Sequence, residues 1–193
     1  MKKKLDLRVI RTQKSIKQAF FKLLKEKDCD KITIQDIADE AMINRNTFYL
    51  HYQDKQDFIK KYSVECLEKL DLSIQIEIGQ LDNMTKHRFY KVIESMCRTI
   101  EEDLEFYQIM LGNYGKTNFQ RKMKDILKKH FAVEINNKQL LSNTEKELSI
   151  EYMISGIIGV ICLWIDTQQY DVSDIAKVLG EAYFSNISNI LGV

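Results

Sequence analysis

The sequence contains no proline and only seven glycines among its 193 residues. Because proline interrupts helices and glycine weakens them, their scarcity leaves long helices unopposed. Leucine, isoleucine, lysine and glutamate are plentiful instead, which is typical of helical proteins. The composition therefore predicts an all-α chain, and the apolar patterns described below give about nine helices in total.

Closely spaced cysteines and a signal peptide are also missing. Cys29, Cys66, Cys97 and Cys162 lie too far apart in the sequence for the paired spacing of a zinc or redox site. Scattered thiols of this kind indicate a reducing environment, so we expect a cytoplasmic protein. The basic N-terminus has no apolar segment after it, and export is therefore not expected.

The chain has no long hydrophobic run. Its most apolar stretch, residues 157–165, is shorter than the ~20 residues that a helix needs to cross a bilayer. We interpret this stretch as part of a buried helix, and we expect no membrane partner.

The sequence lacks the residue patterns of an enzyme. His51, His87 and His130 are isolated, and there is no glycine-rich phosphate loop, metal-spaced ligand set or nucleophile elbow. The acidic run Glu101-Glu102-Asp103 is interpreted as a solvated helix face, because neighbouring helical residues point in different directions. We therefore predict a protein without catalytic activity, metal or cofactor.

Charge is unevenly distributed along the chain. The formal net charge is only +1, but residues 1–60 hold 14 Lys/Arg against 9 Asp/Glu, which leaves 15 against 19 for the remainder. The first 25 residues hold nine basic side chains against Asp6 alone. An N-terminal region with a net charge of +5 suits a polyanion, although a basic run can also be simply a solvated face.

Residues 33–55 contain two short helical patterns and a tight turn, too little chain to build a core alone. Thr33 can cap the first helix, with Asp36 three residues later in the arrangement of a capping box. Apolar residues of this helix and of the helix before it recur at helical spacing: Ile34, Ile37, Ala38 and Ala41 in the first set, and Ile16, Ala19, Phe20, Leu23 and Leu24 in the second. Three helices are thus predicted to share one small core.

The third helix is predicted from Arg45 to about Leu50, with Asn44 as its N-cap. Its outward face would hold Arg45, Asn46, Thr47 and Tyr49, whereas Phe48 would turn inward. This layout is that of a helix-turn-helix that binds DNA.

The run Thr47-Phe48-Tyr49-Leu50-His51-Tyr52, followed by Asp54-Lys55, makes the pattern specific. Residues 8–59 resemble the DNA-binding domain of the TetR family of bacterial transcription regulators. Met42 stands where many members have glycine, so a strained turn is expected. The resemblance implies a DNA-binding domain over residues 1–55 and a helical ligand-binding and dimerisation domain over residues 56–193.

The predicted DNA contacts fall into two groups. Arg45 suits guanine, Asn46 suits adenine and Thr47 suits a thymine methyl group. The resemblance implies that five further residues contact or approach the phosphates: Thr33, Gln35, Tyr49, His51 and Lys55. Asn44, at the start of the third helix, completes the set of predicted DNA contacts. For three of them another role stays open, because His51 could pack or cap, Tyr49 could lie at the rim and Thr33 could only cap.

Six further helices are predicted after the motif, over residues 58–78, 86–102, 104–111, 119–135, 144–167 and 172–191. The clearest breaks are residues 79–85, 112–115 and 136–137.

The last two helices are predicted to form a homodimer interface, from Thr144 to Leu191. The helix predicted over residues 144–167 carries apolar residues on nearly every side, and a single partner helix could not cover them all: Ile150, Met153, Ile154, Ile157, Ile158, Ile161, Leu163, Trp164 and Ile165. Gly156 and Gly159 would allow another backbone to approach. The last helix has its own stripe: Ile175, Val178, Leu179, Ala182 and Ile187. The alternative is that both helices are simply core of one chain.

The resemblance implies a repressor that binds a palindromic operator on double-stranded DNA as a homodimer and is released by a small-molecule effector. Apolar and aromatic residues such as Phe89, Phe106 and Trp164 could line the effector site, but none is assigned. One alternative is an activator controlled by a protein partner, as in the dihydroxyacetone-kinase-regulator branch of the family. Another is a helical interaction protein that does not bind DNA.

Overall fold

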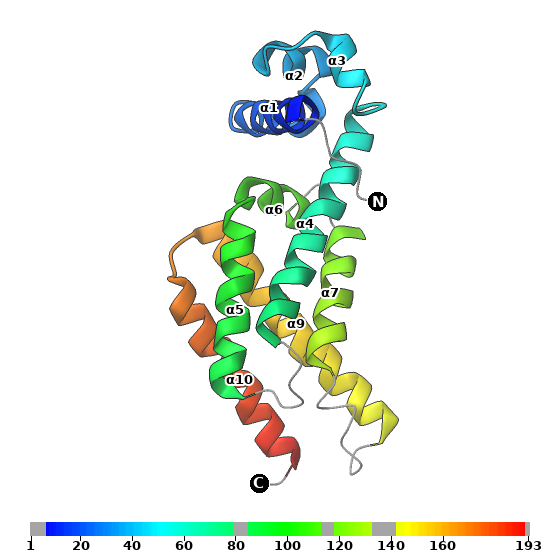
Figure 1. Cartoon of the computed structure of the whole chain (residues 1–193). Helices are drawn as coiled ribbons and strands as arrows, with labels where there is room; N and C mark the ends of the chain where they lie inside the picture. Colours follow the sequence, from blue (N-terminus) through cyan, green and yellow to red (C-terminus); the bar gives the residue numbers. More distant parts are fainter. Residues whose placement is uncertain (1–6, 79–84, 113–117, 133–141, 192–193) are drawn as a thin grey trace. The chain divides into compact units, whose positions relative to one another are not determined.

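The computed structural model describes residues 7–78, 85–112, 118–132 and 142–191, together with the side chains of all but 186–191 of these. Within these ranges the chain forms nine α-helices and one short 3₁₀ helix, without any strand (Figure 1). The all-α fold predicted from the composition is therefore confirmed.

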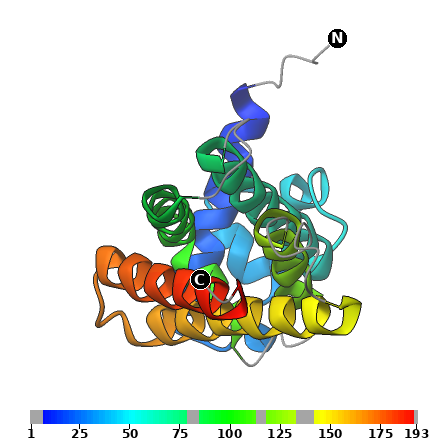
Figure 2. The same ribbon diagram turned by 90° about the horizontal axis from the view of Figure 1, so that it is seen from below.

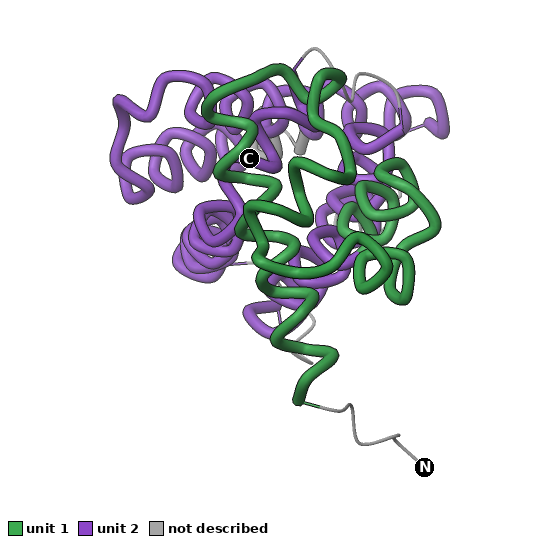
Figure 3. Tube along the Cα trace, turned by 90° about the horizontal axis from the view of Figure 1, so that it is seen from above, with its two compact units in different colours: residues 1–64 green, residues 65–193 purple. Residues whose placement is uncertain are grey.

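The chain divides into two compact units, which are residues 1–64 and residues 65–193 (Figure 3). Helix α4 (Lys55–Ile78) contributes its first turns to the first unit and its remainder to the second. The division predicted from the sequence, between residues 55 and 56, falls at the start of this helix.

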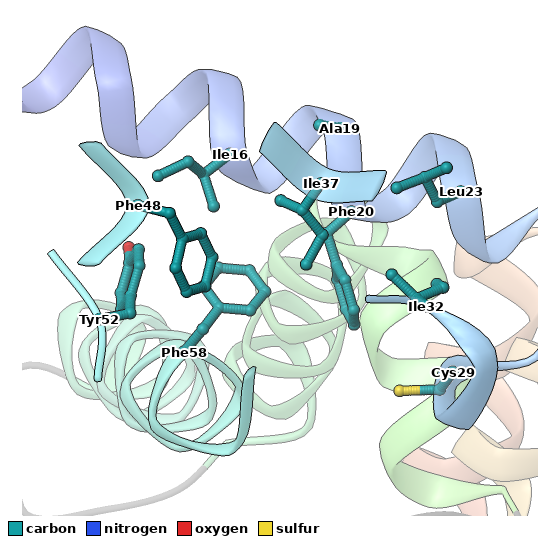
Figure 4. Packing of buried hydrophobic residues seen from close by; sticks show 10 residues of the cluster. All are labelled: Ile16, Ala19, Phe20, Leu23, Cys29, Ile32, Ile37, Phe48, Tyr52 and Phe58. Carbon is teal, nitrogen blue, oxygen red and sulfur yellow. The ribbon is translucent and has the colours of Figure 1, made fainter. Parts of the chain in front are cut away.

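The first unit is built on α1 (Leu7–Leu24), η1 (Cys29–Lys31), α2 (Ile34–Glu40) and α3 (Arg45–Tyr49), with the start of α4. Its core is aromatic and aliphatic, and Figure 4 shows the cluster: Ile16, Ala19, Phe20, Leu23, Cys29, Ile32, Ile37, Phe48, Tyr52 and Phe58. The ring of Phe58 lies 5.0 Å from that of Phe20 and 5.0 Å from that of Tyr52, both edge-on. The shared three-helix core predicted from the apolar spacing is confirmed, and α4 adds to it.

The second unit contains the rest of α4 with α5 (Lys86–Glu101), α6 (Leu104–Leu111), α7 (Asn118–Phe131), α9 (Asn143–Thr167) and α10 (Val172–Leu191). Most bounds of these helices match the predicted ranges within one residue, but α4 begins three residues before the predicted start at 58, and α7 ends at Phe131, four residues before the predicted end at 135. Residues 79–84, 113–117 and 133–141 lie outside the described part, and with them most of the predicted breaks. Side-chain caps start two of these helices: Thr85 accepts from the Arg88 N–H, and Ser142 forms a capping box with Glu145.

Helices α5 and α10 pack closely together. Gly180 of α10 makes the approach possible, because a Cβ at that position would lie 1.9 Å from Cε1 of Tyr90. On the same contact, the buried ring of Tyr183 stacks on that of Phe89, with 4.4 Å between their centroids.

Asp103 is buried, which corrects the interpretation of residues 101–103 as a solvated face. Only 3% of Asp103 is exposed, whereas Glu101 and Glu102 lie at the surface. One carboxylate oxygen of Asp103 accepts a hydrogen bond from Lys69 Nζ at 3.1 Å and faces the Cys66 thiol. The ion pair offsets the cost of burying the charge, so α4 is joined to the start of α6.

His130 is not isolated either. Its Nε2 lies 2.6 Å from Oδ1 of Asp71, and the neighbouring Lys129 donates to both oxygens of the same carboxylate. Helix α7 is therefore joined to α4 by a small charged cluster. Among the described residues no group of three or more histidine, cysteine, aspartate or glutamate side chains is arranged to hold a metal ion.

Helix α9 is a core helix of the second unit, in contact with α6, α7 and α10. Seven of its predicted apolar residues are buried within this chain: Met153, Ile154, Ile157, Ile158, Ile161, Trp164 and Ile165. By length and composition alone this 25-residue helix could cross a membrane, and 39% of its most apolar stretch is buried. The predicted run of residues 157–165 therefore covered only part of a longer apolar helix.

Candidate DNA-binding site

Helix α2 begins at a complete capping box. The Thr33 hydroxyl accepts from the Asp36 N–H at 3.1 Å, while Oδ2 of Asp36 accepts from the Thr33 N–H at 2.8 Å. The Thr33 N–H, the Thr33 hydroxyl, which donates to the same oxygen at 2.8 Å, and the nearby Lys27 ammonium lower the pKa of the Asp36 carboxyl from 3.8 to about 2. The predicted cap is confirmed, and it occupies the Thr33 hydroxyl that the sequence also assigned to a phosphate.

The turn between α2 and α3 passes through a left-handed residue. Met42 has φ 53°, and 93% of its surface is exposed. A side chain at such an angle crowds its own backbone, so this turn is strained, as the sequence predicted. Asn44 then caps α3, since its Oδ1 accepts from the Asn46 N–H at 2.8 Å.

Helix α3 turns one side chain inward and presents the others. Phe48 is fully buried in the first core, whereas Arg45, Asn46 and Tyr49 are exposed and Thr47 is half-buried. Nη2 of Arg45 donates to the phenol oxygen of Tyr49 at 3.0 Å, one turn along the helix. The predicted outward face is therefore present, and two of its members are already joined.

Gln35 and His51 flank this face at different places. The exposed Gln35 donates from Nε2 to Oδ1 of Asp39 at 2.7 Å. The half-buried His51 follows α3, and its carbonyl accepts from Lys61 Nζ at 3.2 Å. Lys61 was not singled out from the sequence, because its partner lies ten residues away and no local pattern links the two.

Lys55 has partners that the sequence did not predict. Its Nζ donates to the carbonyls of Cys29 at 2.7 Å, Ile32 at 2.8 Å and Asp30 at 3.3 Å. The resemblance implied a phosphate contact for this residue, and that contact stays a prediction. The ammonium is engaged within the first unit.

Several carboxylates of the first unit are paired with lysines. Lys22 lies 2.6 Å from Glu40, Lys27 lies 3.0 Å from Asp36, and Lys31 lies 2.8 Å from Asp28. These exposed pairs add little stability, but they reduce the repulsion that the carboxylates would exert on a polyanion. Two exposed apolar residues, Met42 and Leu50, lie at the two ends of the α3 segment and were not predicted as contacts.

Two family models match the chain. Residues 17–62 match the family described as "Bacterial regulatory proteins, tetR family", and residues 87–183 match "Transcriptional regulator C-terminal region" of the same family. The chain belongs to the TetR family. The match over the first unit includes the capped α2, the turn and α3, so the TetR resemblance of the sequence is confirmed.

Among known proteins, the "uncharacterized HTH-type transcriptional regulator YxbF" of Bacillus subtilis (strain 168) is 22% identical over 154 residues. This match covers 78% of the chain but only 39% of that relative's length. The chain therefore spans less than half the length of this relative.

Solved TetR-family structures share the fold over nearly the whole chain. The "Dihydroxyacetone kinase operon activator DhaS" is 21% identical with a TM-score of 0.63, and the match covers 92% of this chain and 96% of that one. The transcriptional regulator FadR from Bacillus subtilis, solved with stearoyl-CoA, is 19% identical with a TM-score of 0.62, and the match covers 90% and 98%.

Membership of the TetR family fixes the general function. The protein is a DNA-binding transcription regulator, as the sequence predicted. The capped α3 with its exposed arginine and asparagine is the part of the first unit that is chemically suited to base edges.

Proposed function

We propose that this regulator binds a palindromic operator as a homodimer, reads it with α3 and acts as a repressor. The observation that carries the proposal is the arrangement of α3, in which Phe48 is fully buried while Arg45 and Asn46 are exposed at the helix start. Helix-turn-helix proteins place the start of this helix against base edges in the major groove.

Each residue of α3 has a proposed role. Arg45 pairs with O6 and N7 of guanine, Asn46 pairs with N6 and N7 of adenine, and Thr47 contacts a thymine methyl group. Tyr49 and His51 bind phosphates on one side of the groove. Thr33, Gln35 and Asn44 lie at helix starts, where backbone N–H groups favour a phosphate.

The direct test is selection of bound sequences from a random DNA pool, followed by affinity measurements on the selected site. The Arg45→Ala variant is expected to lose ~1–3 kcal/mol of specific binding and its preference at one base position. Arg121→Ala is the matched control, because it removes an exposed arginine from α7 in the second unit. An enriched inverted repeat is expected for the wild type.

The opposite results are equally clear. Absence of any enriched sequence under low-salt conditions, with the protein folded, would contradict the proposal and favour a helical interaction protein. Equal losses in Arg45→Ala and Arg121→Ala would mean that Arg45 contributes charge without reading a base.

The proposed dimer interface is the outward face of α9 and α10, two helices that lie side by side in Figure 2. Exposed Tyr152, Leu163 and Val178 contribute to this face, and a groove of about 350 Å³ runs between the two helices. Among the residues that the structure describes, a Cβ at Gly156 or Gly159 would meet nothing within 4 Å. The open space beside these glycines supports the close approach of a second copy of the same face.

An aspartate on this face tests the dimer. Leu163→Asp and Val178→Asp are each expected to give monomers at micromolar concentration, measured by light scattering, because burying an unpaired carboxylate is costly. Leu72→Asp is the matched control, since Leu72 is an exposed leucine of α4, and it should leave the mass unchanged. A wild-type monomer would exclude the proposed interface.

A small-molecule effector, in the cytoplasm, is proposed to release the regulator from its operator. FadR was solved with stearoyl-CoA, which makes an acyl-CoA a reasonable first probe for release of the operator. The sign of regulation is tested with the gene next to the selected operator. Deleting the regulator raises transcription if it represses and lowers transcription if it activates, as DhaS is described to do.

A further inference from the structure

The Lys55 ammonium has its whole donor capacity engaged by backbone carbonyls. A lysine ammonium carries three N–H groups and accepts no hydrogen bond. The three carbonyl oxygens, of Cys29, Asp30 and Ile32, lie 2.7, 3.3 and 2.8 Å from Nζ. A phosphate could bind this ammonium only if at least one of these bonds were given up.

These carbonyls belong to the segment that leads into α2. They come from η1 and from Ile32, the residue before the Thr33 cap. Carbonyls at the end of a helical turn carry partial negative charge, so an ammonium stabilises them. The Cys29 carbonyl also accepts from the Ile32 N–H, at 3.3 Å. Cys29 and Ile32 are buried in the first core, and this fixes the position of the carbonyls on one side of the contact.

The other side of the contact is equally fixed. Lys55 is the first residue of α4, and Phe58, one turn later, is buried against Phe20 and Tyr52. The ammonium thus connects the start of α4 to the start of α2, two helices whose first residues are 21 positions apart, at 34 and 55.

We propose that Lys55 is a positioning residue, which holds the α2–α3 segment in register with α4, and that its ammonium is not a phosphate contact. The inference rests on the proposed DNA binding by α3. Loss of Lys55 should shift the entry to α2 and so misplace Arg45 and Asn46 relative to base edges. Specific binding would weaken, while the number of phosphates neutralised would stay the same.

The salt dependence of DNA binding separates the two roles. Removing a phosphate contact lowers the slope of log K against log salt by about 0.9, whereas loss of a positioning residue lowers affinity without changing the slope. Lys55→Met keeps the length of the side chain and is expected to bind the selected operator about tenfold more weakly or worse, with the wild-type slope. Lys60→Met is the matched control, an exposed lysine of the same helix.

The measurements are made at a temperature where circular dichroism shows each variant to be folded. If Lys55 only stabilised the folded state, the affinity of Lys55→Met for the operator would then be unchanged, because nearly all of the protein is folded. Lys55→Arg is the second variant. Arginine binds phosphate well, but its broad planar guanidinium does not fit three carbonyls around one point. Weakened operator binding by Lys55→Arg is therefore expected.

Three results would overturn the inference. The first is a slope reduced by about one in Lys55→Met beyond that of Lys60→Met, the second is wild-type operator affinity in folded Lys55→Met, and the third is wild-type affinity in Lys55→Arg. Failure of the proposed function looks different, since the wild-type protein itself would then show no sequence preference. A Lys55→Met variant that does not fold leaves the Lys55→Arg comparison decisive.

Discussion

The two units of this regulator hold their polar groups by different means. In the first unit the polar side chains of α2 and α3 lie outside a small aromatic core. Short-range hydrogen bonds orient them, as between Thr33 and Asp36 or between Arg45 and Tyr49. In the second unit a charge is buried, at Asp103, and an apolar face is exposed on α9 and α10. The first arrangement suits recognition of a polyanion, and the second suits association between helices.

The largest expected effect tests whether the two units unfold separately. Phe48→Ala empties part of the first core and should cost that unit ~3–5 kcal/mol. The only tryptophan of the sequence, Trp164, is buried in the second unit, so its fluorescence reports on that unit alone. In Phe48→Ala the first unit is expected to unfold before the second. Amide exchange in α2 and α3 should therefore become faster, while the Trp164 fluorescence stays unchanged.

The control for this experiment lies two residues away. Leu50→Ala removes a side chain that is 82% exposed and should change stability by no more than ~0.5 kcal/mol. A simultaneous loss of the Trp164 signal in Phe48→Ala would show that the two units form one cooperative body.

A second test concerns the close contact in the second unit. Gly180→Ala places a Cβ on the Tyr90 ring and should destabilise the α5–α10 packing by ~1–3 kcal/mol. Urea unfolding followed by Trp164 fluorescence measures the change. The Gly180→Ala and Tyr90→Ala double variant should be more stable than the sum of its parts, because the clash is then absent. Strict additivity would speak against the clash.

A smaller effect of opposite sign is expected in the first unit. Met42→Gly relieves the left-handed strain at φ 53° and should raise the stability of that unit by about 1 kcal/mol. Ala41→Gly is the control, since Ala41 has an ordinary φ of −76° and should lose stability instead. Thermal unfolding of the first unit measures both, and a destabilised Met42→Gly would mean that the methionine side chain makes a contact of its own.

The smallest effect compares one carboxylate from each unit. The pKa of Asp36 is lowered to about 2, chiefly by the Thr33 backbone bond, whereas the pKa of Glu151 is lowered to about 2, chiefly by Lys124 and Lys128. Both carboxylates contribute stability above their ordinary pKa values, 3.8 and 4.5, and lose it as the pH falls towards about 2.

Salt distinguishes the two carboxylates, because it screens lysine ammonium groups more than it affects backbone bonds. High salt should raise the pKa of Glu151 more than that of Asp36, and titration of the carboxyl carbons by NMR at low and high salt measures both shifts. Asp36→Asn should abolish the pH dependence of the α2 cap. Equal shifts of the two pKa values would show that charge, and not the backbone bond, dominates at Asp36.

Local features of this chain were predictable from its sequence. The caps at Thr33 and Asn44 act within three residues, and the inward position of Phe48 follows from helical spacing. The helix ranges follow from the same periodicity. Long-range partners could not be predicted, because the contacts of Lys55, Asp103 and His130 span 26, 34 and 59 residues. No sequence window contains both ends of such a contact.

The outward face of α9 shows a second reason for failure. Apolar residues surround this helix, so periodicity does not distinguish its inward side from its outward side. Seven residues of α9 that were assigned to the interface are instead buried within the chain, as are Ile175 and Leu179 of α10, while exposed Tyr152 was not assigned. The predicted dimer itself stays a prediction.

The hydrogen bond between Arg45 and Tyr49 has a consequence for the affinity of the proposed DNA contact. It engages one of the five N–H donors of the guanidinium, so the remaining planar fork is already oriented before DNA arrives. A side chain restricted in the free protein gives up little rotational freedom on docking. In the proposed DNA complex, ordering of the Arg45 side chain should therefore cost little, and a phenylalanine in place of Tyr49 would restore that cost while leaving the helix intact.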